Sequence, residues 1–343
     1  METTNNIAVN DNFNKLIDKN MINNNINAVA VSNNSVWAKF GVSGETLINK
    51  NIESIPCVIE PIFQMVGLAC IAGGSDTGKS SFLRYLCMCI VAGFEYFIGF
   101  PIKSKHRRAI YVSSEDDELA VNFLINKQNK DMQIESSKLR DLLFVFDTEN
   151  LLDKLDRMMT EKPVDLVCID AFGDLFGNSN SNDNTQVRAF LNQYSQLAQK
   201  HQCLIIFLHH TGKGKENGAP SKNNLLGSQG IEAKMRIVME LKNDKVEANV
   251  KHLCIIKGNY LPQDAKNESF KLRFTENMVY ENTGDRIPFE NLKRSDDAEK
   301  EKYVKAKELK EKGLTYEKIA KEIGYANKGN VSKLIQKFEN QEE

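Results

Sequence analysis

The sequence predicts an α/β protein with a mostly parallel β-sheet, followed by a small all-α module toward its C-terminal end. Three observations predict this fold class. Apolar runs of strand length alternate with helical stretches from about residue 56 to 282. A glycine-rich loop stands between one such run and the helix after it. Beyond about Lys300, short helical stretches follow one another without a strand.

Strands and helices are expected to alternate along this core. The helical stretches carry apolar residues three and four positions apart, so each should bury one face. The strand runs are short, rich in apolar residues and separated by polar segments. The expected strands are LACIAG, AIYVS, LLFVF, LVCID, CLIIFLHH, IVMEL and LCIIK, and the expected helices include DELAVNFLINKQ, NLLDKLDRMM and TQVRAFLNQYSQLAQK.

We expect the 343 residues to form four parts. Residues 1–55 are rich in asparagine and poor in large apolar side chains, which favours a solvated arm, with docking on another subunit as the alternative. Residues 56–282 form the α/β core. Residues 283–299 contain a glycine, a proline and a charge cluster and are predicted to be a linker, and residues 300–343 form the helical module.

Composition narrows the class of protein. There are 45 basic and 46 acidic residues, so any contact with nucleic acid must be local. Six of the seven cysteines lie in apolar runs and no CxxC pair occurs, which indicates a reducing cytoplasm and argues against structural zinc. The N-terminus does not fit a secretory signal. Arg84 and Glu95 interrupt the apolar stretch 82–100, so we expect a buried helix and no membrane contact.

The segment GGSDTGKSS fits the pattern G-x-x-x-x-G-K-[ST] and lies between a strand and a helix. Glycines let backbone N–H groups turn toward phosphate oxygens, and the helix N-terminus adds the positive end of its dipole. Lys79 should neutralise the β- and γ-phosphates, and Ser80 should bind Mg²⁺. We therefore predict ATP and Mg²⁺ as cofactors, held by Gly73, Gly74, Ser75, Asp76, Thr77, Gly78, Lys79, Ser80 and Ser81.

Two further strands end in acidic residues. Asp170 ends DLVCID, and we expect it to hold Mg²⁺ beside the phosphates, with a turn-capping acid as the alternative. Glu115 follows AIYVS, which we expect one strand away from the phosphate loop, and it can act as the general base on the attacking water. Asp116, Asp117 and Glu118 compete for that role or favour the next helix through its dipole.

His209 and His210 end the strand CLIIFLHH at the same expected edge of the sheet. Two adjacent histidines at this edge can sense the γ-phosphate and pass its presence to the polar loop that follows. Core histidines without a function are the alternative.

In this order, GGSDTGKSS, SSEDDE, DLVCIDAFGDLFG, FLHHTGKG and LGSQGIEAKMRIVMEL resemble the RepA-like branch of the RecA-fold hexameric helicases, over residues 56 to about 260. The set is also similar to the DnaB-type replicative helicases. The resemblance implies a RecA-like P-loop core. It also implies catalytic roles for Lys79, Glu115 and Asp170 and phosphate sensing by His209 and His210.

The same resemblance, counted from Gly227, places Arg236 at the position of that family's arginine finger. A finger stabilises charge on the ATP of a neighbouring subunit, so the resemblance implies a homo-oligomer, a hexameric ring. A surface arginine at the start of a strand is the alternative. The chain departs from the family at Leu226, where an arginine is frequent, and at Asn259, which replaces the second basic residue of a hook that begins at Lys257.

Two loops are candidates for contact with single-stranded DNA. They are GDLFGNSNSNDN after Asp170 and the stretch after His210 that carries Lys213, Lys215 and Lys222. In RecA-like rings such loops face the central channel, and lysines there suit a contact that does not depend on base sequence. Solvated loops are the alternative.

The C-terminal segment resembles a helix-turn-helix, with one helix to Lys312, a second over 316–323, Gly324 at the turn and a third from Asn330. Small three-helix units also serve as protein docking modules, which is the alternative. If the module binds duplex DNA, the contacts come from the third helix and the residue before it. These contact residues are Lys328, Asn330, Ser332, Lys333 and Lys337.

Together these features predict an ATP-hydrolysing, oligomeric, DNA-associated motor, a RepA-like replicative helicase of a plasmid, phage or mobile element. One alternative is a DNA-binding regulator or loader in which ATP sets the assembly state. Another is a recombinase filament.

Overall fold

The computed structural model describes residues 40–176, 183–212, 218–225, 228–292, 296–325 and 327–342. The chain divides into two units, Met1–Ile55 and Pro56–Glu343. In the first unit, the short helix α3 (Gly44–Ile48) begins after Ser43, whose hydroxyl accepts a hydrogen bond from the Thr46 N–H at 3.1 Å. None of the residues of α3 is buried.

The second unit contains a nine-stranded sheet in the order β13-β12-β11-β10-β3-β9-β8-β6-β7. From β10 to β7 every neighbouring pair is parallel, whereas β10, β11, β12 and β13 pair antiparallel. The mostly parallel sheet confirms the predicted fold class. The strands are β3 (Gly67–Gly73), β6 (Ala109–Ser113), β7 (Leu142–Val145), β8 (Leu166–Asp170), β9 (Leu204–His210), β10 (Ile237–Asn243), β11 (Val250–Gly258), β12 (Glu268–Phe274) and β13 (Tyr280–Pro288).

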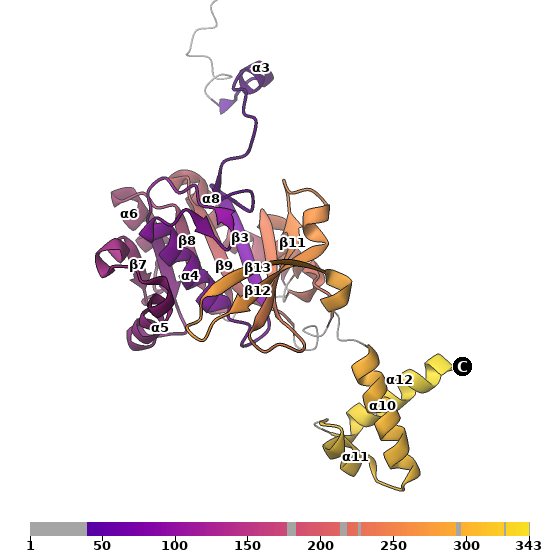
Figure 1. Cartoon of the computed structure of the whole chain (residues 1–343). Helices are drawn as coiled ribbons and strands as arrows, with labels where there is room; N and C mark the ends of the chain where they lie inside the picture. Colours follow the sequence, from indigo (N-terminus) through magenta and orange to yellow (C-terminus); the bar gives the residue numbers. More distant parts are fainter. Residues whose placement is uncertain are drawn as a thin grey trace, which may run out of the picture. The chain divides into compact units, whose positions relative to one another are not determined.

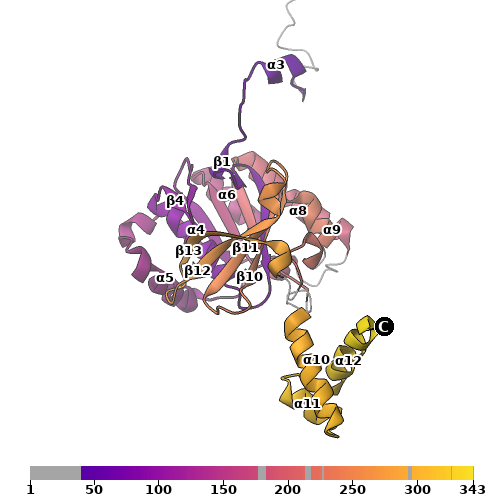
Figure 2. The ribbon, with the colours of Figure 1, turned by 45° about the vertical axis from the view of Figure 1, so that its right-hand side comes forward.

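Helices cover both faces of the sheet (Figures 1 and 2). Ala69 and Ile71 of β3 belong to the core layer under α4 and α5, and the neighbouring residues of β3 belong to the layer under α6, α7, α8 and α9. This alternation follows from the two-residue period of a strand. The helices are α4 (Lys79–Ala92), α5 (Glu118–Met132), α6 (Leu151–Glu161), α7 (Phe172–Phe176), α8 (Asn184–His201) and α9 (Ser228–Lys234).

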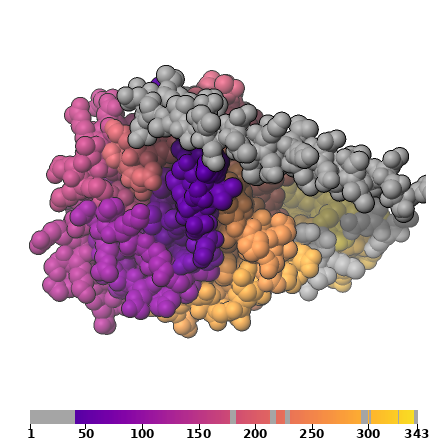
Figure 3. Space-filling view, turned by 90° about the horizontal axis from the view of Figure 1, so that it is seen from above, coloured from indigo at the N-terminus to yellow at the C-terminus, as the bar shows by residue number. Residues whose placement is uncertain are grey.

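The two edges of the sheet carry different parts of the chain. In the space-filling view, the purple and magenta residues of the β6–β7 side and the orange residues of the antiparallel side lie on opposite sides of the molecule (Figure 3). β3 lies between these sides, so the glycine-rich loop that follows it lies near the middle of the sheet.

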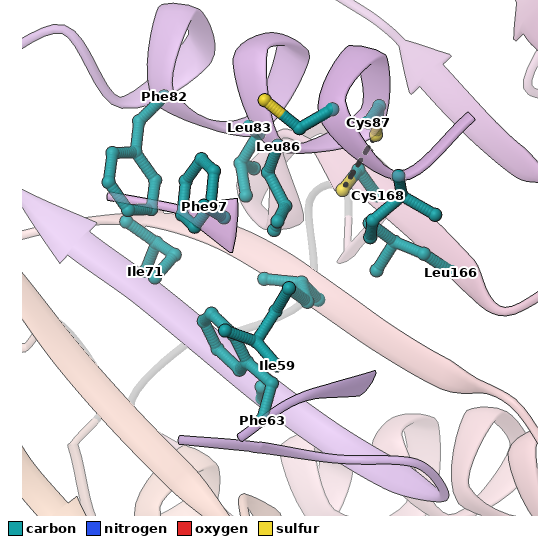
Figure 4. Packing of buried hydrophobic residues seen from close by; sticks show 14 of the residues in the cluster. Ile59, Phe63, Ile71, Phe82, Leu83, Leu86, Cys87, Phe97, Leu166 and Cys168 are labelled. Atoms are coloured by element: carbon teal, nitrogen blue, oxygen red, sulfur yellow. Dashed lines mark hydrogen bonds between the residues drawn. The ribbon is translucent and has the colours of Figure 1, made fainter. Parts of the chain in front are cut away.

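Helix α4 packs on the sheet through an apolar face. Phe82, Leu83 and Leu86 point from α4 toward the strands (Figure 4). The Sγ atoms of Cys87 on α4 and Cys168 on β8 lie 3.5 Å apart in the same layer. The six cysteines predicted to act as small apolar residues are all buried and unbridged, namely Cys70, Cys87, Cys89, Cys168, Cys203 and Cys254.

All seven expected strands are present, but the sequence did not predict β12 and β13. β13 reads YENTGDRIP, in which residues 281–286 carry no apolar side chain, and it lies at the edge of the sheet with β12 as its single described neighbour. An exposed edge strand needs no apolar alternation, so the periodic signal is absent. Two short pairs were also missed: β1 (Cys57–Ile59) with β2 (Phe63–Gln64), and β4 (Tyr96–Phe97) with β5 (Phe100–Pro101).

The linker expected from residue 283 was placed too early. β13 continues to Pro288 and the 3₁₀ turn η4 (Phe289–Leu292) follows it. Gly284, with φ 87°, lies where the register between β12 and β13 shifts, so it marks a β-bulge and not an exit from the sheet.

The C-terminal segment forms three helices around an apolar cluster that includes Ile319, Val331 and Leu334. Gly313 and Gly324 have positive φ after the first and second helix, as glycines at helix ends commonly do. The helices are α10 (Asp296–Glu311), α11 (Tyr316–Glu322) and α12 (Lys328–Glu342). Across the described part of the chain, no helix has the length and apolar character needed to cross a bilayer.

Candidate active site

The glycine-rich loop connects β3 to α4, as the sequence predicted, and two of its glycines have no substitute. Gly78 adopts φ 88°, and a Cβ atom there would collide with the Tyr280 hydroxyl. A Cβ atom on Gly73 would lie 2.5 Å from the Leu241 carbonyl oxygen. The loop is therefore packed so closely that only glycine fits at these two places.

Lys79 is held against the loop. Its side chain is 6% exposed, and its Nζ atom donates a hydrogen bond to the Gly74 carbonyl at 2.6 Å. The Thr77 hydroxyl donates to the same carbonyl at 3.0 Å, and the Tyr280 hydroxyl donates to the Gly78 carbonyl at 2.8 Å. These contacts fix the shape of the loop and keep a positive charge beside it, which suits phosphate oxygens.

Asp170 ends β8 as a buried carboxylate. The Tyr111 hydroxyl donates to its Oδ2 atom at 2.5 Å, and its Oδ1 atom is buried without a hydrogen bond from any described residue. Burial raises the pKa of Asp170, and the hydroxyls of Tyr111 and Ser80 and the charge of Arg84 act in the opposite direction. A carboxylate oxygen without a partner beside the hydroxyl of Ser80 fits Mg²⁺, which takes oxygen ligands and completes its shell with phosphate and water.

No group of three or more His, Cys, Asp or Glu side chains able to hold an ion occurs among the described residues. Mg²⁺ would therefore be bound through Ser80 and Asp170 together with the phosphates. This arrangement is usual for a metal that arrives with the nucleotide.

Glu115 lies just beyond β6, with its side chain 53% exposed. Its Oε1 atom is 3.8 Å from Nε2 of His210. Partial burial raises the pKa of Glu115, as do the charges of Asp170 and Asp174, while His210 lowers it. A carboxylate with a raised pKa near other site groups has the character of a general base.

Our expectation that β6 lies one strand from the phosphate loop was wrong, because β9 and β8 both stand between β3 and β6. The order of strands along the chain does not fix their order in a sheet, since each crossover helix can carry the chain past positions that later strands fill. Glu115 nevertheless reaches the site, because β6 and β8 are parallel neighbours and Ser113 pairs with Asp170.

The neighbouring acids have other partners. Asp116 forms an ion pair with Arg84 at 3.7 Å. Asp117 is the N-cap of α5 and accepts the Ala120 N–H at 2.8 Å, and Glu118 is the first residue of that helix. Of the four acids in this turn, Glu115 is the one beside His210.

The two histidines lie beside the glycine-rich loop in different surroundings. His209 pairs in register with Ala72 and is 5% exposed, and its ring packs edge-on against Phe172 at 5.2 Å. His210 pairs with Gly73 and faces Glu115. Strand alternation separates them, so His210 is the better placed of the two to meet a γ-phosphate.

Arg236 is not part of this cluster. It is exposed, its Nη1 atom donates to the Tyr260 hydroxyl at 3.1 Å, and its backbone N–H donates to Leu68 at the start of β3. The phosphate loop begins past the other end of β3, about 16 Å away at 3.3 Å per residue. Arg236 therefore lies near the opposite end of β3 from the phosphate loop of its own chain.

The predicted DNA-contacting residues divide into two groups. Lys213 and Lys215 lie outside the described residues, as do residues 177–182 of the loop after Asp170, and Lys222 pairs with Glu232 at 2.9 Å. On α12 the predicted residues are all exposed, but Lys328 pairs with Glu317 and Lys337 with Glu299 inside the same module.

A cavity of about 320 Å³ adjoins the phosphate loop on the side opposite β9. Gly74, Ser75 and Thr77 line it together with the segment 240–245 and Leu292. The sequence did not predict that this segment lies at the site, nor that Tyr111, Tyr280 and Arg84 support it. Of these residues, Arg84 could have been found from the sequence, because it is a charged residue inside an otherwise apolar helix. A tyrosine in a core strand is not unusual, so Tyr111 and Tyr280 could not have been found in this way.

A family model described as an AAA domain matches residues 42–216, which is 175 of the 343 residues. The match covers the glycine-rich loop and the strands that carry Glu115, Asp170 and both histidines. No curated protein matches the sequence significantly.

Proposed function

We propose that this chain, which belongs to the AAA domain family of P-loop ATPases, hydrolyses ATP with Mg²⁺ as a ring-shaped homo-oligomer that acts on DNA. In its finer form the proposal is a RepA-like replicative helicase of a plasmid, phage or mobile element. The observation that carries it is the gathering of Lys79, Ser80, Asp170, Glu115 and His210 at one edge of the parallel strands, with Arg236 near the opposite end of β3.

Each residue has a role that follows from its surroundings. Lys79 and the loop N–H groups bind the β- and γ-phosphates. Ser80 and Asp170 would hold Mg²⁺, which would supply positive charge to the phosphates of the leaving group. Glu115 accepts a proton from the water that attacks the γ-phosphate, and His210 beside it orients both groups.

The cavity beside the loop indicates how a bound nucleotide would be oriented. Asp170, Glu115 and His210 lie on the β9 side of β3, so the γ-phosphate belongs on that side. The nucleoside then extends toward the β10 side, where the cavity opens next to Gly74. The segment 240–245 lines this cavity and would lie beside the base or the ribose.

The position of Arg236 supports a shared site between subunits. It is exposed and held by Tyr260, and it cannot reach its own phosphate loop. An arginine that acts on ATP from such a place must act on the ATP of another copy, which requires an oligomer such as the proposed ring.

A regulator or loader without unwinding activity is the second candidate. One observation favours it: two of the three lysines expected to meet DNA on the C-terminal module, Lys328 and Lys337, already pair with acids of that module. A module with neutralised lysines binds the phosphate backbone weakly.

The experiment that tests the proposal measures ATP-dependent unwinding of forked DNA together with ATP hydrolysis, with and without single-stranded DNA. Unwinding and DNA-stimulated hydrolysis support the helicase. Hydrolysis without strand separation supports the regulator, and filaments on DNA in electron micrographs support a recombinase.

A further inference from the structure

Arg84 is a charged residue inside the apolar helix that follows the phosphate loop. It lies five positions after Lys79 on α4 and is 2% exposed. Its neighbours on the helix, among them Leu83 and Leu86, pack into the core layer seen in Figure 4. A guanidinium in such a place is unfavourable unless it is paired and fully hydrogen-bonded.

The pairing of Arg84 is incomplete. Its Nη2 atom donates to the Ser81 hydroxyl at 3.4 Å, and its Nη1 atom lies 3.7 Å from Oδ2 of Asp116. Its Nε and Nη1 atoms are buried and form no hydrogen bond with the described residues. These contacts are too few to make the buried charge a good stabiliser of the fold, so stability alone does not account for it.

The contacts of Arg84 instead lead to the turn that carries Glu115. Asp116 is the next residue after Glu115, and its backbone carbonyl accepts the Ser113 hydroxyl at 2.8 Å. Asp117 then caps α5. The turn is thus fixed to β6 at one end and to α5 at the other, and Arg84 joins its middle to α4.

We propose that Arg84 is a positioning residue for ATP hydrolysis, which holds the turn 113–117, and with it Glu115, against the helix that begins at the phosphate loop. This inference rests on the proposed ATPase function. It assigns to α4 two tasks, because one end of the helix binds phosphate and Arg84, further along it, places the general base. Small displacements of a catalytic group lower turnover steeply, while nucleotide binding depends on other contacts.

The test measures kcat and KM for ATP, the affinity for a fluorescent ATP analogue and the thermal midpoint of Arg84→Met, Arg84→Lys and Asp116→Asn. Arg84→Met should lower kcat about 10-fold or more, leave KM and the affinity nearly unchanged, and leave the midpoint equal or higher. Arg84→Lys should recover part of the loss, because an ammonium can still pair with Asp116.

The effects on kcat of changing Arg84 and Asp116 should also be coupled. Asp116→Asn should lower kcat in the same way, and the double variant should be no slower than Arg84→Met alone. Arg108→Met is the matched control, because Arg108 pairs with Asp141 at 3.9 Å near the other end of β6. This control should keep the kcat of the unaltered protein.

Unchanged kcat in Arg84→Met, or losses that multiply in the double variant, would overturn the inference and leave the proposed function standing. If the unaltered protein hydrolyses ATP no faster than Lys79→Ala, both this inference and the proposed function are overturned. If Arg84→Met does not fold, Asp116→Asn decides, because Asp116 is 39% exposed and its change removes the same ion pair.

Discussion

Under the proposed function, Lys79 and Asp170 supply the two charges that meet Mg·ATP, one from the loop and one from a buried strand end. Lys79→Ala should lower ATP turnover at least about 10²-fold, because it removes the contact with the β- and γ-phosphates. Asp170→Asn should raise the Mg²⁺ concentration needed for half-maximal turnover. Steady-state hydrolysis across a Mg²⁺ titration checks both, and near-normal behaviour of both variants would remove the assignment of the site.

Glu115 is the residue whose role can be separated most cleanly from that of its neighbours. Glu115→Gln should bind ATP but hydrolyse it about 10²-fold more slowly, as the loss of a general base does. Glu118→Gln, at the first position of α5, is the control and should retain turnover. If the control loses activity while Glu115→Gln keeps it, the base has been misassigned.

The pH dependence of turnover gives a second measurement on Glu115. A base acts in its deprotonated form, so turnover should fall as the pH falls through the pKa of Glu115. Burial and the charges of Asp170 and Asp174 raise that pKa above its usual value of about 4.3. The acid limb of the kcat profile should therefore lie above this value, and a limb at or below it would contradict the assignment.

At the scale of elements, Glu240 holds the strand next to β3 to the segment after the histidines. It is 1% exposed and accepts hydrogen bonds from the Ser221 N–H and the Asn224 side chain, both at 3.1 Å, and from Lys242 at 3.3 Å. Glu240→Ala should lower the free energy of unfolding by about 3 kcal/mol or more, because the Ser221 N–H, the Asn224 amide and Lys242 all lose the buried carboxylate to which they donate.

Urea denaturation checks this prediction, with Glu247→Ala as the control. Glu247 is an exposed acid that pairs with Lys271 near the surface, so its loss should leave the denaturation midpoint unchanged. Equal midpoints for Glu240→Ala and the unaltered protein would show that the buried pair does not hold these elements together.

What the sequence could predict at this scale depends on how each element is stabilised. The seven strands that contribute to the buried parallel sheet and to its first antiparallel partner carry strong apolar runs, so all of them were found. β13 is polar and exposed at the edge, so its pairing depends on β12 and on a bulge at Gly284 that no periodicity reveals. Tyr280 belongs to this missed strand and supports the phosphate loop.

The candidate site, too, could be predicted from the sequence only in part. Its motifs are local, so Lys79, Ser80 and the strand-end residues could be read from the sequence. The order of the strands is a property of the folded sheet, which is why β6 was expected too close to β3. Contacts between distant segments, such as Tyr111 with Asp170 and Arg84 with Asp116, have no sequence signature at all.

At the scale of the whole molecule, the account requires more than one copy of the chain. Arg236 lies near the far end of β3 from the phosphate loop, so one chain alone cannot form the shared site that we propose. An arginine finger is worth about 10³-fold or more in turnover and contributes little to folding. Arg236→Ala should therefore be folded, able to bind nucleotide and nearly inactive.

The measurement that tests this claim most directly is ATP hydrolysis by a mixture of Arg236→Ala and Lys79→Ala chains. In a mixed oligomer, the intact phosphate loop of one chain meets the intact arginine of the other, so the mixture should hydrolyse ATP well above either variant alone. If the two variants demonstrably assemble together and restore nothing, or if Arg236→Ala is active alone, Arg236 does not complete a neighbour's site and the shared-site account is contradicted.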